Sequence, residues 1–273
     1  MRVVILGCGP AGLFAAHAAV LAGHEIEIYS RCRKSEMFGA QYLHEAIPGL
    51  SEGSGFLLEY FLEGSPEGYA QKVYGDVPPD FVSPEKLVGV HQVWDIRAAY
   101  DRSWVLYGEK VVNVDRITAR DLVEATRPGG FLAGARVIST IPARSICRRP
   151  AFHTFAVREA WAVGDAPERG VACPITVAED TVVCDGTPDT GWYRASNIRG
   201  FRTAEWPEER RPPVTDIAKI SKVVRTNCDC WKAEGFWRTG RYGTWDKRVL
   251  THHAFWEILG AFRSEEGRHP GDG

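Results

Sequence analysis

The 273-residue sequence predicts a protein of the α/β class, in which a parallel sheet carries a second, smaller antiparallel sheet. Two observations support the parallel sheet: a strand, a helix and a strand follow one another within the first 30 residues, and a buried strand returns near residue 136. The stretch between residues 147 and 207 is instead rich in short strands and turns, which is typical of an antiparallel sheet.

The opening strand-helix-strand unit has the most regular pattern. Residues 2–6 form a short β-branched apolar run that is typical of a buried strand, and residues 10–21 form an alanine-rich helix that ends at Gly23. Residues 25–29 supply the second strand. This order implies a right-handed crossover and parallel pairing of the two strands.

A hairpin is predicted after this unit. Residues 56–63 and 69–74 have the composition of two paired strands, and residues 65–68 hold proline and glycine where a type I turn places them. We expect this hairpin to leave the parallel sheet.

Two helices are predicted in the next segment. Ser83 and Pro84 have the character of an N-cap and a first-turn proline, and aromatic and apolar residues recur at helical spacing over residues 96–107. Thr118 with Asp121 resembles a capping box that opens a short helix.

The remaining elements return to the first sheet and complete the second. Residues 136–141 are expected to rejoin the parallel sheet as a buried strand. Residues 191–196 and 200–206 predict an antiparallel pair that turns around Asn197, and residues 245–262 predict one long helix.

The strongest chemical signal is the motif Gly7-Cys-Gly9-Pro10-Ala11-Gly12, which follows the first strand directly and opens the first helix. Gly7 permits the tight turn, Gly9 lets a pyrophosphate approach the backbone, and Gly12 allows close packing of the helix. The helix N-terminus adds unpaired N–H groups and the positive end of its dipole. We therefore expect a Rossmann-like FAD/NAD(P)-binding domain with a small inserted antiparallel β substrate domain.

Domain boundaries follow from this interpretation. We expect a discontinuous dinucleotide-binding domain, a substrate or cap region inserted into it, and a flexible tail. These three parts correspond in turn to residues 1–50, 110–146 and 236–263, to residues 51–109 and 147–235, and to residues 264–273.

The end of the second strand departs from the usual dinucleotide pattern. Ser30 stands where an acidic residue commonly binds the adenosine ribose, and Arg31, Arg33 and Lys34 follow it. A hydroxyl beside a basic cluster favours the 2′-phosphate of NADP. Alternatively, Ser30 binds the ribose of FAD, and the basic residues face its phosphates or solvent.

Three further segments follow the glycine motif: the loop at 39–44 (G-A-Q-Y-L-H), the strand at 137–143 (V-I-S-T-I-P-A) and the segment at 240–245 (G-R-Y-G-T-W). Together with the motif they resemble the FAD-binding elements of the glutathione-reductase-type flavoproteins. Within that superfamily the sequence is most similar to the amine oxidase, protoporphyrinogen oxidase and UDP-galactopyranose mutase branch. Because the chain is shorter than most members of that branch, it resembles a compact member such as those of bacteriophages.

The resemblance implies FAD as the cofactor, with NADP as the alternative. In the late segment, glycines would let the main chain pass close to a flat ring, and an arginine would meet the phosphates or a ring carbonyl. Beyond the glycine motif, the implied cofactor contacts are Ser30, Arg31, Gly39, Ala40, Thr140, Gly240, Arg241, Gly243 and Thr244.

His44 and Arg194 are the candidate catalytic residues. His44 ends the 39–44 loop, and a histidine can act as acid, base or hydrogen-bond partner near neutral pH. Arg194 lies with Tyr193 and Glu205 in the strand pair that, by the resemblance, would cover the flavin, where a guanidinium among aromatic walls suits a carboxylate or phosphate. The alternative for both residues is an ordinary structural role.

The seven cysteines are odd in number and scattered, which favours reduced thiols and a cytoplasmic location. Cys228-Asp-Cys230 could suggest zinc together with Cys147, Cys173, Cys184 and His153. However, the C-x-C pair lacks the C-x-x-C spacing of a zinc knuckle, and the sequence has no second pair of that kind. We therefore predict no metal site.

The expected function is that of an FAD-dependent oxidoreductase, which oxidises an amine, an amino-acid-like group or a related small polar group by hydride transfer to the flavin. Four alternatives stay open. They are a non-redox flavin-dependent UDP-sugar mutase, an NADP-dependent reductase, a phage-type flavoenzyme acting on modified DNA bases, and a dinucleotide-binding protein without turnover.

Charge and hydropathy limit the partners. A formal net charge of −2 and a pI near 6.5 give no support to nucleic-acid binding, although they do not exclude it. No apolar run of about 18 residues predicts a membrane span. A small-molecule substrate is therefore expected, and a homo-oligomer is one way in which so short a chain could complete its substrate site.

Overall fold

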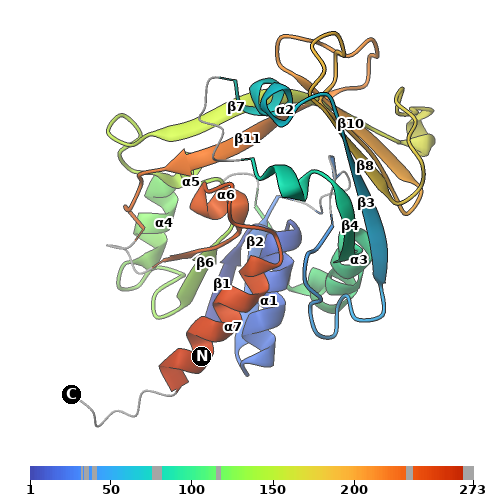
Figure 1. Cartoon of the computed structure of the whole chain (residues 1–273). Coiled ribbons are helices and arrows are strands. Elements are labelled where there is room, and N and C mark those ends of the chain that lie inside the picture. Colours follow the sequence, from blue (N-terminus) through green and yellow to red (C-terminus); the bar gives the residue numbers. More distant parts are fainter. Residues whose placement is uncertain are drawn as a thin grey trace.

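A five-stranded parallel sheet forms the lower part of the molecule in Figure 1. In spatial order its strands are β12 (Trp237–Arg238), β6 (Arg136–Ser139), β1 (Arg2–Leu6), β2 (Glu25–Ser30) and β5 (Val111–Asn113). Every pair is parallel, and the strand order reverses at β1, which is where open α/β sheets bind their ligands. The computed structural model describes residues 1–31, 33, 37–38, 42–75, 82–114, 118–231 and 236–266.

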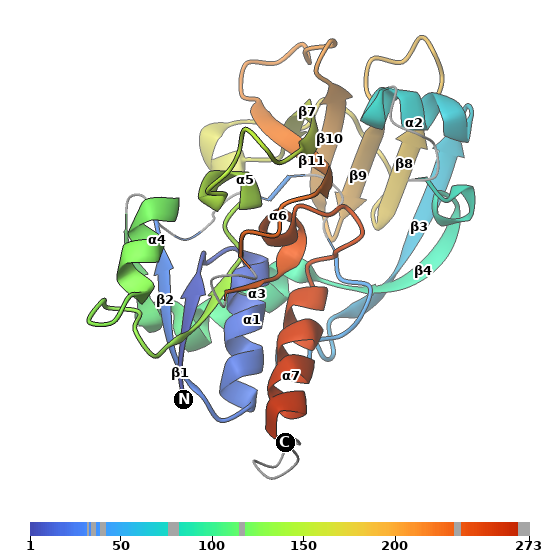
Figure 2. The same ribbon diagram turned by 90° about the vertical axis from the view of Figure 1, so that its left-hand side faces the viewer.

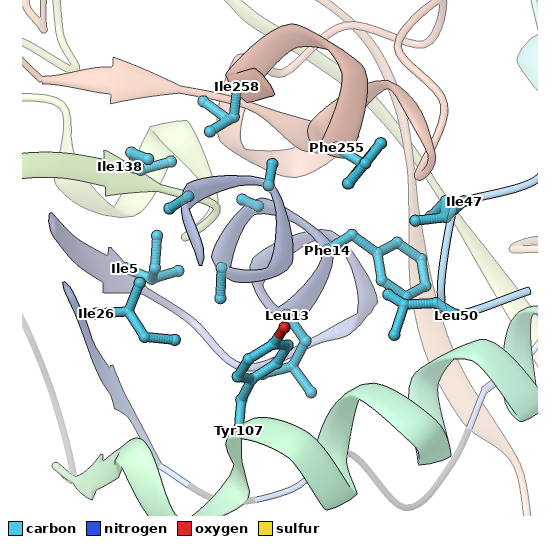
Figure 3. Packing of buried hydrophobic residues seen from close by; sticks show 14 of the residues in the cluster. Ile5, Leu13, Phe14, Ile26, Ile47, Leu50, Tyr107, Ile138, Phe255 and Ile258 are labelled. Carbon is cyan, nitrogen blue, oxygen red and sulfur yellow. The ribbon is translucent and has the colours of Figure 1, made fainter. Parts of the chain in front are cut away.

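Helices cover both faces of this sheet. On one face lie α1 (Pro10–Leu21), α3 (Ile96–Tyr107) and α7 (His253–Glu266), and on the other lies α4 (Ala119–Thr126). The small alanine side chains of α1 let its two neighbouring helices pack closely around it. Figure 3 shows this apolar core, to which the sheet and the three helices contribute Ile5, Leu13, Phe14, Ile26, Tyr107, Ile138, Phe255 and Ile258.

A seven-stranded sheet lies above the parallel sheet, and Figures 1 and 2 both show this arrangement. Its strands in spatial order are β11 (Ala218–Thr226), β7 (Phe155–Gly164), β10 (Phe201–Pro207), β9 (Arg194–Ile198), β8 (Thr181–Asp185), β3 (Gly55–Glu63) and β4 (Gly89–Trp94). Neighbours are antiparallel except β3 and β8, which are parallel. The predicted second sheet is therefore present, but it is mixed, and it has more strands than the parallel sheet.

Three short helices connect the two sheets or lie beside them. They are α2 (Pro66–Tyr74), α5 (Ala143–Ile146) and α6 (Gly240–Thr244), of which α6 lies between the sheets and contacts α5 and β11 (Figure 2). Single 3-10 turns occur at Pro84–Lys86, Gly108–Lys110 and Pro167–Arg169. Among the described residues, no helix has both the length and the apolar character that crossing a membrane requires.

The predicted hairpin over residues 56–74 is half wrong. β3 is the first strand, but the predicted second strand is helix α2. The Ser65 side chain accepts a hydrogen bond from the backbone N–H of Gly68 and caps the helix, and Pro66 occupies its first turn. A type I turn and the first turn of a helix use the same residue types, so the local sequence fits both structures.

The helix predicted to begin at Ser83 and Pro84 is also wrong at its start. These residues open only a 3-10 turn, and strand β4 follows, which the sequence interpretation missed. The helical spacing over residues 96–107 is confirmed as α3, whose N-cap is Asp95. α3 packs on α1, beside the parallel sheet.

The long helix predicted over residues 245–262 is broken. α6 ends at Trp245, which has a left-handed backbone (φ 55°) and buries its indole against Phe155. The backbone N–H of Lys247 then bonds to the carbonyl of Val224 on β11, and α7 begins only at His253. Residues 267–273, most of the predicted tail, lie outside the described residues.

Three local predictions are confirmed. Thr118 and Asp121 form a complete capping box at the start of α4. β6 rejoins the parallel sheet beside β1. β9 and β10 form the predicted antiparallel pair, although the turn lies at Arg199 and Gly200 rather than at Asn197. The division into domains stays a prediction.

Candidate functional site

A cavity of about 1070 Å³ lies between the two sheets. The residues that follow the carboxyl ends of the parallel strands line one side of it, and side chains of β3, β9, β10 and β11 line the other. The volume is at the upper end of the range of about 300–1,000 Å³ that is usual for ligand sites. It has room for a dinucleotide together with a small second molecule.

The glycine turn lines this cavity. Gly7 has a φ of +101°, and a Cβ on Gly12 would lie 1.9 Å from the Gly7 carbonyl oxygen, so both positions require glycine. A Cβ on Gly9 would meet no atom within 4 Å, because Gly9 faces the open cavity. This is the cradle that a pyrophosphate needs.

The N-terminus of α1 supplies hydrogen-bond donors to this cradle. The first intrahelical bond runs from the Leu13 N–H to the Gly9 carbonyl, so the N–H groups of Ala11 and Gly12 have no acceptor within the helix. The first turn carries no acidic side chain and no side-chain cap. The helix end is therefore open to an anion.

The late glycine-arginine segment meets the glycine turn directly. A Cβ on Gly240 would lie 2.7 Å from the Cβ of Ala11. The two segments that the sequence predicted to bind the cofactor therefore lie side by side in the wall of the cavity. Arg241 lines the cavity, and its Nε donates to the carbonyl of Val249 at 3.2 Å. Burial lowers the pKa of Arg241, but a guanidinium stays charged at neutral pH.

The residues that follow β2 and β5, where the sequence predicted a ribose contact, line another part of the cavity. Ser30 and Arg31 line it, together with Thr118 at the start of α4. The Ser30 Oγ accepts a hydrogen bond from the backbone N–H of Cys8 at 3.1 Å, and its own proton can point into the cavity. Arg33 is instead paired with Asp101. Of the predicted basic cluster, Arg31 alone among the described residues faces the cavity, which weakens the argument for a 2′-phosphate.

The opposite end of the cavity lies under the second sheet, and we call it the chamber. Glu205, which is 1% exposed, accepts hydrogen bonds there from Arg194 (2.6 Å) and Lys222 (2.5 Å). Burial opposes ionisation of Glu205, but the two cations outweigh it and lower its pKa to about 2. Burial lowers the pKa of Lys222 to about 8, against the attraction of Glu205. The Arg194 side chain is 23% exposed and lines the cavity, so part of its guanidinium can approach a ligand there.

Tyrosine rings form the walls of the chamber. The hydroxyls of Tyr42 and Tyr60 are hydrogen-bonded, and burial raises the pKa of both phenols. His44 lies beside Tyr42, with ring centroids 4.9 Å apart, and burial with nearby positive charge lowers its pKa. Its imidazole is therefore neutral at pH 7 and can accept or donate a hydrogen bond.

Most of the predicted site residues line this one cavity. They are Gly7, Gly9, Pro10, Ala11, Gly12, Ser30, Arg31, His44, Thr140, Arg194, Gly240 and Arg241. Gly243 and Thr244 do not line it: Gly243 packs against the backbone at Ser139 and Thr140, and the Thr244 hydroxyl donates to the Gly240 carbonyl. Gly39 and Ala40 lie outside the described residues. The role of each residue as a cofactor or catalytic contact stays a prediction.

Sequence reasoning missed several residues of the chamber. Tyr60, Tyr74, Lys222 and Lys247 line it, but each looked like an ordinary residue of a strand, helix or loop. Lys222 lies on β11, the strand at one edge of the second sheet, whereas Tyr60 lies on β3, near the opposite edge. No local signal connects these residues, because they come from β3, α2, β11 and the segment after α6 and meet only in the folded structure.

Comparison with known proteins gives a match in structure but not in sequence. No protein-family model matches the chain, and no curated protein sequence matches it significantly. BrvH, a flavin-dependent halogenase from Brevundimonas sp. BAL3, is 11% identical with a TM-score of 0.55, over 96% of this chain and 71% of that one. A flavoprotein/dehydrogenase from Cytophaga hutchinsonii is 10% identical with a TM-score of 0.51, over 98% and 80%.

A third solved structure extends the comparison. The tetracycline destructase Tet(51) is 9% identical with a TM-score of 0.50, over 97% of this chain and 83% of that one. At such identities these likenesses establish the fold alone. The resemblance to the amine oxidase branch in particular is not confirmed, since none of the three structures carries that name. The chain has a fold that it shares with flavin-dependent enzymes.

Proposed function

We propose that the protein is an FAD-dependent oxidoreductase that oxidises a small aromatic molecule, neutral or anionic, in the chamber under the second sheet. The observation that carries the proposal is the continuous cavity, which runs from the glycine turn to a tyrosine-lined, positively charged end. The fold is also that of flavin-dependent enzymes.

The residues present fit FAD. The open face of Gly9 and the free N–H groups of Ala11 and Gly12 would hold the pyrophosphate, and Ser30 would bind the ribose. The Gly240–Arg241 bend lies against Ala11, between the pyrophosphate cradle and the chamber, where the flavin ring would lie. Bound FAD would supply the electron acceptor, which no side chain of the cavity can provide.

The charges of the chamber indicate the class of substrate. Among the described residues that line the whole cavity, Arg31, Arg194, Lys222, Arg241 and Lys247 are cationic and only Glu205 is acidic. Glu205 already bonds to two of the cations. A protonated amine would therefore meet repulsion, whereas a carboxylate or phenolate would be attracted. The tyrosine walls suit a flat ring. The expected amine substrate is therefore less favoured than an aromatic acid or phenol.

The chain's own residues would orient this substrate and stabilise its charge. Arg194 offers the exposed part of its guanidinium, and Lys222 offers a charge held in place by Glu205. A cationic wall also stabilises the negative charge of a reduced flavin. His44, neutral and at the edge of the chamber, is placed to accept or return a proton.

Titration of the FAD-loaded protein with aromatic carboxylates, phenols and amines tests this function. A ligand beside the flavin shifts its visible spectrum, and an oxidised substrate bleaches it anaerobically or consumes oxygen. We expect aromatic anions to bind and Lys222→Met to weaken that binding at least about tenfold, which is the loss of about 1.4 kcal/mol. Lys219→Met is the matched control, because Lys219 is exposed on the same strand and pairs with Glu208. Binding and oxidation of amines alone would overturn the assignment of substrate class.

A further inference from the structure

Four metal-ligating side chains meet outside the cavity, although the sequence predicted no metal site. They are Cys147, His153, Cys228 and Cys230, and their ligand atoms all lie within 4.8 Å of one another. Cys147 and Cys228 are buried, with 6% and 7% exposure, and the other two are half-buried. Spacing along the sequence argued against this group because its two halves are 75 residues apart, from His153 to Cys228.

The register of the second sheet brings the two halves together. β7 and β11 are antiparallel, and Phe155 at the start of β7 pairs with Thr226 at the end of β11. The residues just before β7 therefore face the residues just after β11. Hydrogen bonds extend the pairing beyond the strands, since the Thr154 N–H donates to Asn227 Oδ1 at 2.6 Å and the Asn227 N–H donates to the Thr154 carbonyl at 3.3 Å.

The distances fit a tetrahedral ion. Cys147 Sγ lies 3.0 Å from His153 Nδ1 and 3.5 Å from Cys228 Sγ, and Cys230 Sγ lies 3.6 Å from His153 Nδ1. Around a tetrahedral zinc with Zn–S near 2.3 Å and Zn–N near 2.0–2.1 Å, neighbouring ligand atoms are about 3.5–3.8 Å apart. The Cys230–His153 separation matches the S···N value of about 3.5–3.6 Å, whereas the Cys147–Cys228 separation is about 0.3 Å short of the S···S value of about 3.8 Å. The Cys147–His153 separation needs a movement of about half an ångström, and the other three separations are at most 4.8 Å.

Two groups beside the four side chains could stabilise them as zinc ligands: Arg238 lies next to Cys228, and Asp229 lies next to His153. Both terminal nitrogens of Arg238 lie 3.6 Å from Cys228 Sγ, and no carboxylate pairs with this buried guanidinium among the described residues. His153 points its Nδ1 into the group, while its Nε2 lies 3.9 Å from an Asp229 carboxylate oxygen. Three thiolates and one Zn²⁺ carry a net charge of −1, which Arg238 would neutralise.

We propose that Cys147, His153, Cys228 and Cys230 bind one Zn²⁺ ion in a closed structural site. The chain passes from the parallel sheet to the second sheet between β6 and β7, and it returns between β11 and β12. The zinc ion would link the β6–β7 connection to the β11–β12 connection. Cys147 follows directly on α5, whose residue Ser145 lines the cavity, so the ion also holds one wall of the cavity in place. The proposal does not depend on the cofactor.

Metal analysis of the full chain, purified under reducing conditions without chelator, tests the proposal directly. We expect about one zinc per chain, with three sulfur ligands and one nitrogen ligand by X-ray absorption. The competing outcome is a disulfide between Cys147 and Cys228, which a non-reducing peptide map of a second sample, purified without reductant, detects. That disulfide, or the failure of the reduced protein to bind added zinc, would overturn the proposal.

Variants separate the proposed ligands from other cysteines. Cys230→Ser is expected to lower zinc content at least about tenfold in the purified protein. His153→Cys is expected to retain the ion with four sulfur ligands, a common structural zinc set. Cys173→Ser is the control, because Cys173 is buried in a separate core cluster and should leave zinc content unchanged. Full zinc in Cys230→Ser, or loss of zinc in Cys173→Ser, would contradict the assigned site.

Discussion

Two glycines of the same turn are expected to respond to substitution in opposite ways. Gly9 has φ −68° and ψ 175°, a conformation that any residue adopts, and an added side chain points into the open cavity. Gly9→Val should therefore change the free energy of unfolding by no more than about 0.5 kcal/mol. At Gly12 an added Cβ would lie 1.9 Å from the Gly7 carbonyl oxygen, so Gly12→Ala must displace the helix or the turn.

The size of each effect follows from these contacts. A contact of 1.9 Å places Gly12→Ala at the severe end of overpacking, which costs about 3 kcal/mol. The higher helix propensity of alanine returns about 1 kcal/mol, so the variant should lose about 2 kcal/mol of stability. The valine at position 9 would push a pyrophosphate away from the N–H groups of Ala11 and Gly12. Hydrogen bonds to charged groups contribute about 1.5–3 kcal/mol each, so losing two weakens FAD binding about 10²- to 10⁴-fold.

Urea unfolding and FAD titration of both variants measure the two effects separately. The expected result is a stable Gly9→Val protein that does not retain FAD and a destabilised Gly12→Ala protein. Wild-type FAD affinity in Gly9→Val would refute the assignment of the cradle, and wild-type stability in Gly12→Ala would refute the packing argument.

Three other substitutions test separate parts of the account. Arg241→Ala should lower the flavin midpoint potential in a reductive titration, because the reduced flavin anion loses a nearby positive charge. The control is Arg248→Ala, which should leave the potential unchanged because Arg248 is exposed and paired with Asp246. Equal potentials in the two variants would argue that Arg241 does not contact the flavin. Glu205→Gln leaves two cations without their carboxylate and should cost about 3–5 kcal/mol at neutral pH in urea unfolding. The folded pKa of Glu205 is about 2, against an ordinary value of 4.5, so its contribution to stability is present above pH 4.5 and is lost as the pH falls towards 2. The Glu205→Gln variant should therefore lose less stability than the wild type between pH 4.5 and pH 2. Parallel pH profiles of stability for the two proteins would argue against this. Thr118→Ala removes the N-cap of α4 and should cost about 1 kcal/mol, which a thermal melt can detect, and no change would mean that the capping box contributes nothing.

The parts of the fold that the sequence predicted correctly are those with local causes. The strand, glycine turn and helix of the opening unit are specified by residues within a few positions of one another, and so is the capping box at Thr118. The glycine turn is local in the same way, because a Cβ on Gly12 would meet the Gly7 carbonyl oxygen of the same turn. Such features can be predicted from the sequence without knowledge of the tertiary structure.

The failures have non-local causes. Residues 66–74 fit a strand or a helix equally well until the contacts of α2 with β7, β8 and β10 of the second sheet select the helix. Trp245 interrupts an apolar helical pattern because its indole packs on Phe155 of β7, far away in the sequence. The chamber and the cluster around Cys147 depend in the same way on the pairing of strands, which no spacing within one segment encodes.

Titration of the purified, cofactor-free protein with FAD tests the central claim most directly. The claim is that the cavity between the glycine turn and the Gly240–Arg241 bend is a flavin site. The account predicts saturable binding of about one FAD per chain, with quenching of flavin fluorescence as the ring enters the tyrosine-lined chamber. An absence of saturable FAD binding, or tighter binding of NADP than of FAD, would contradict it.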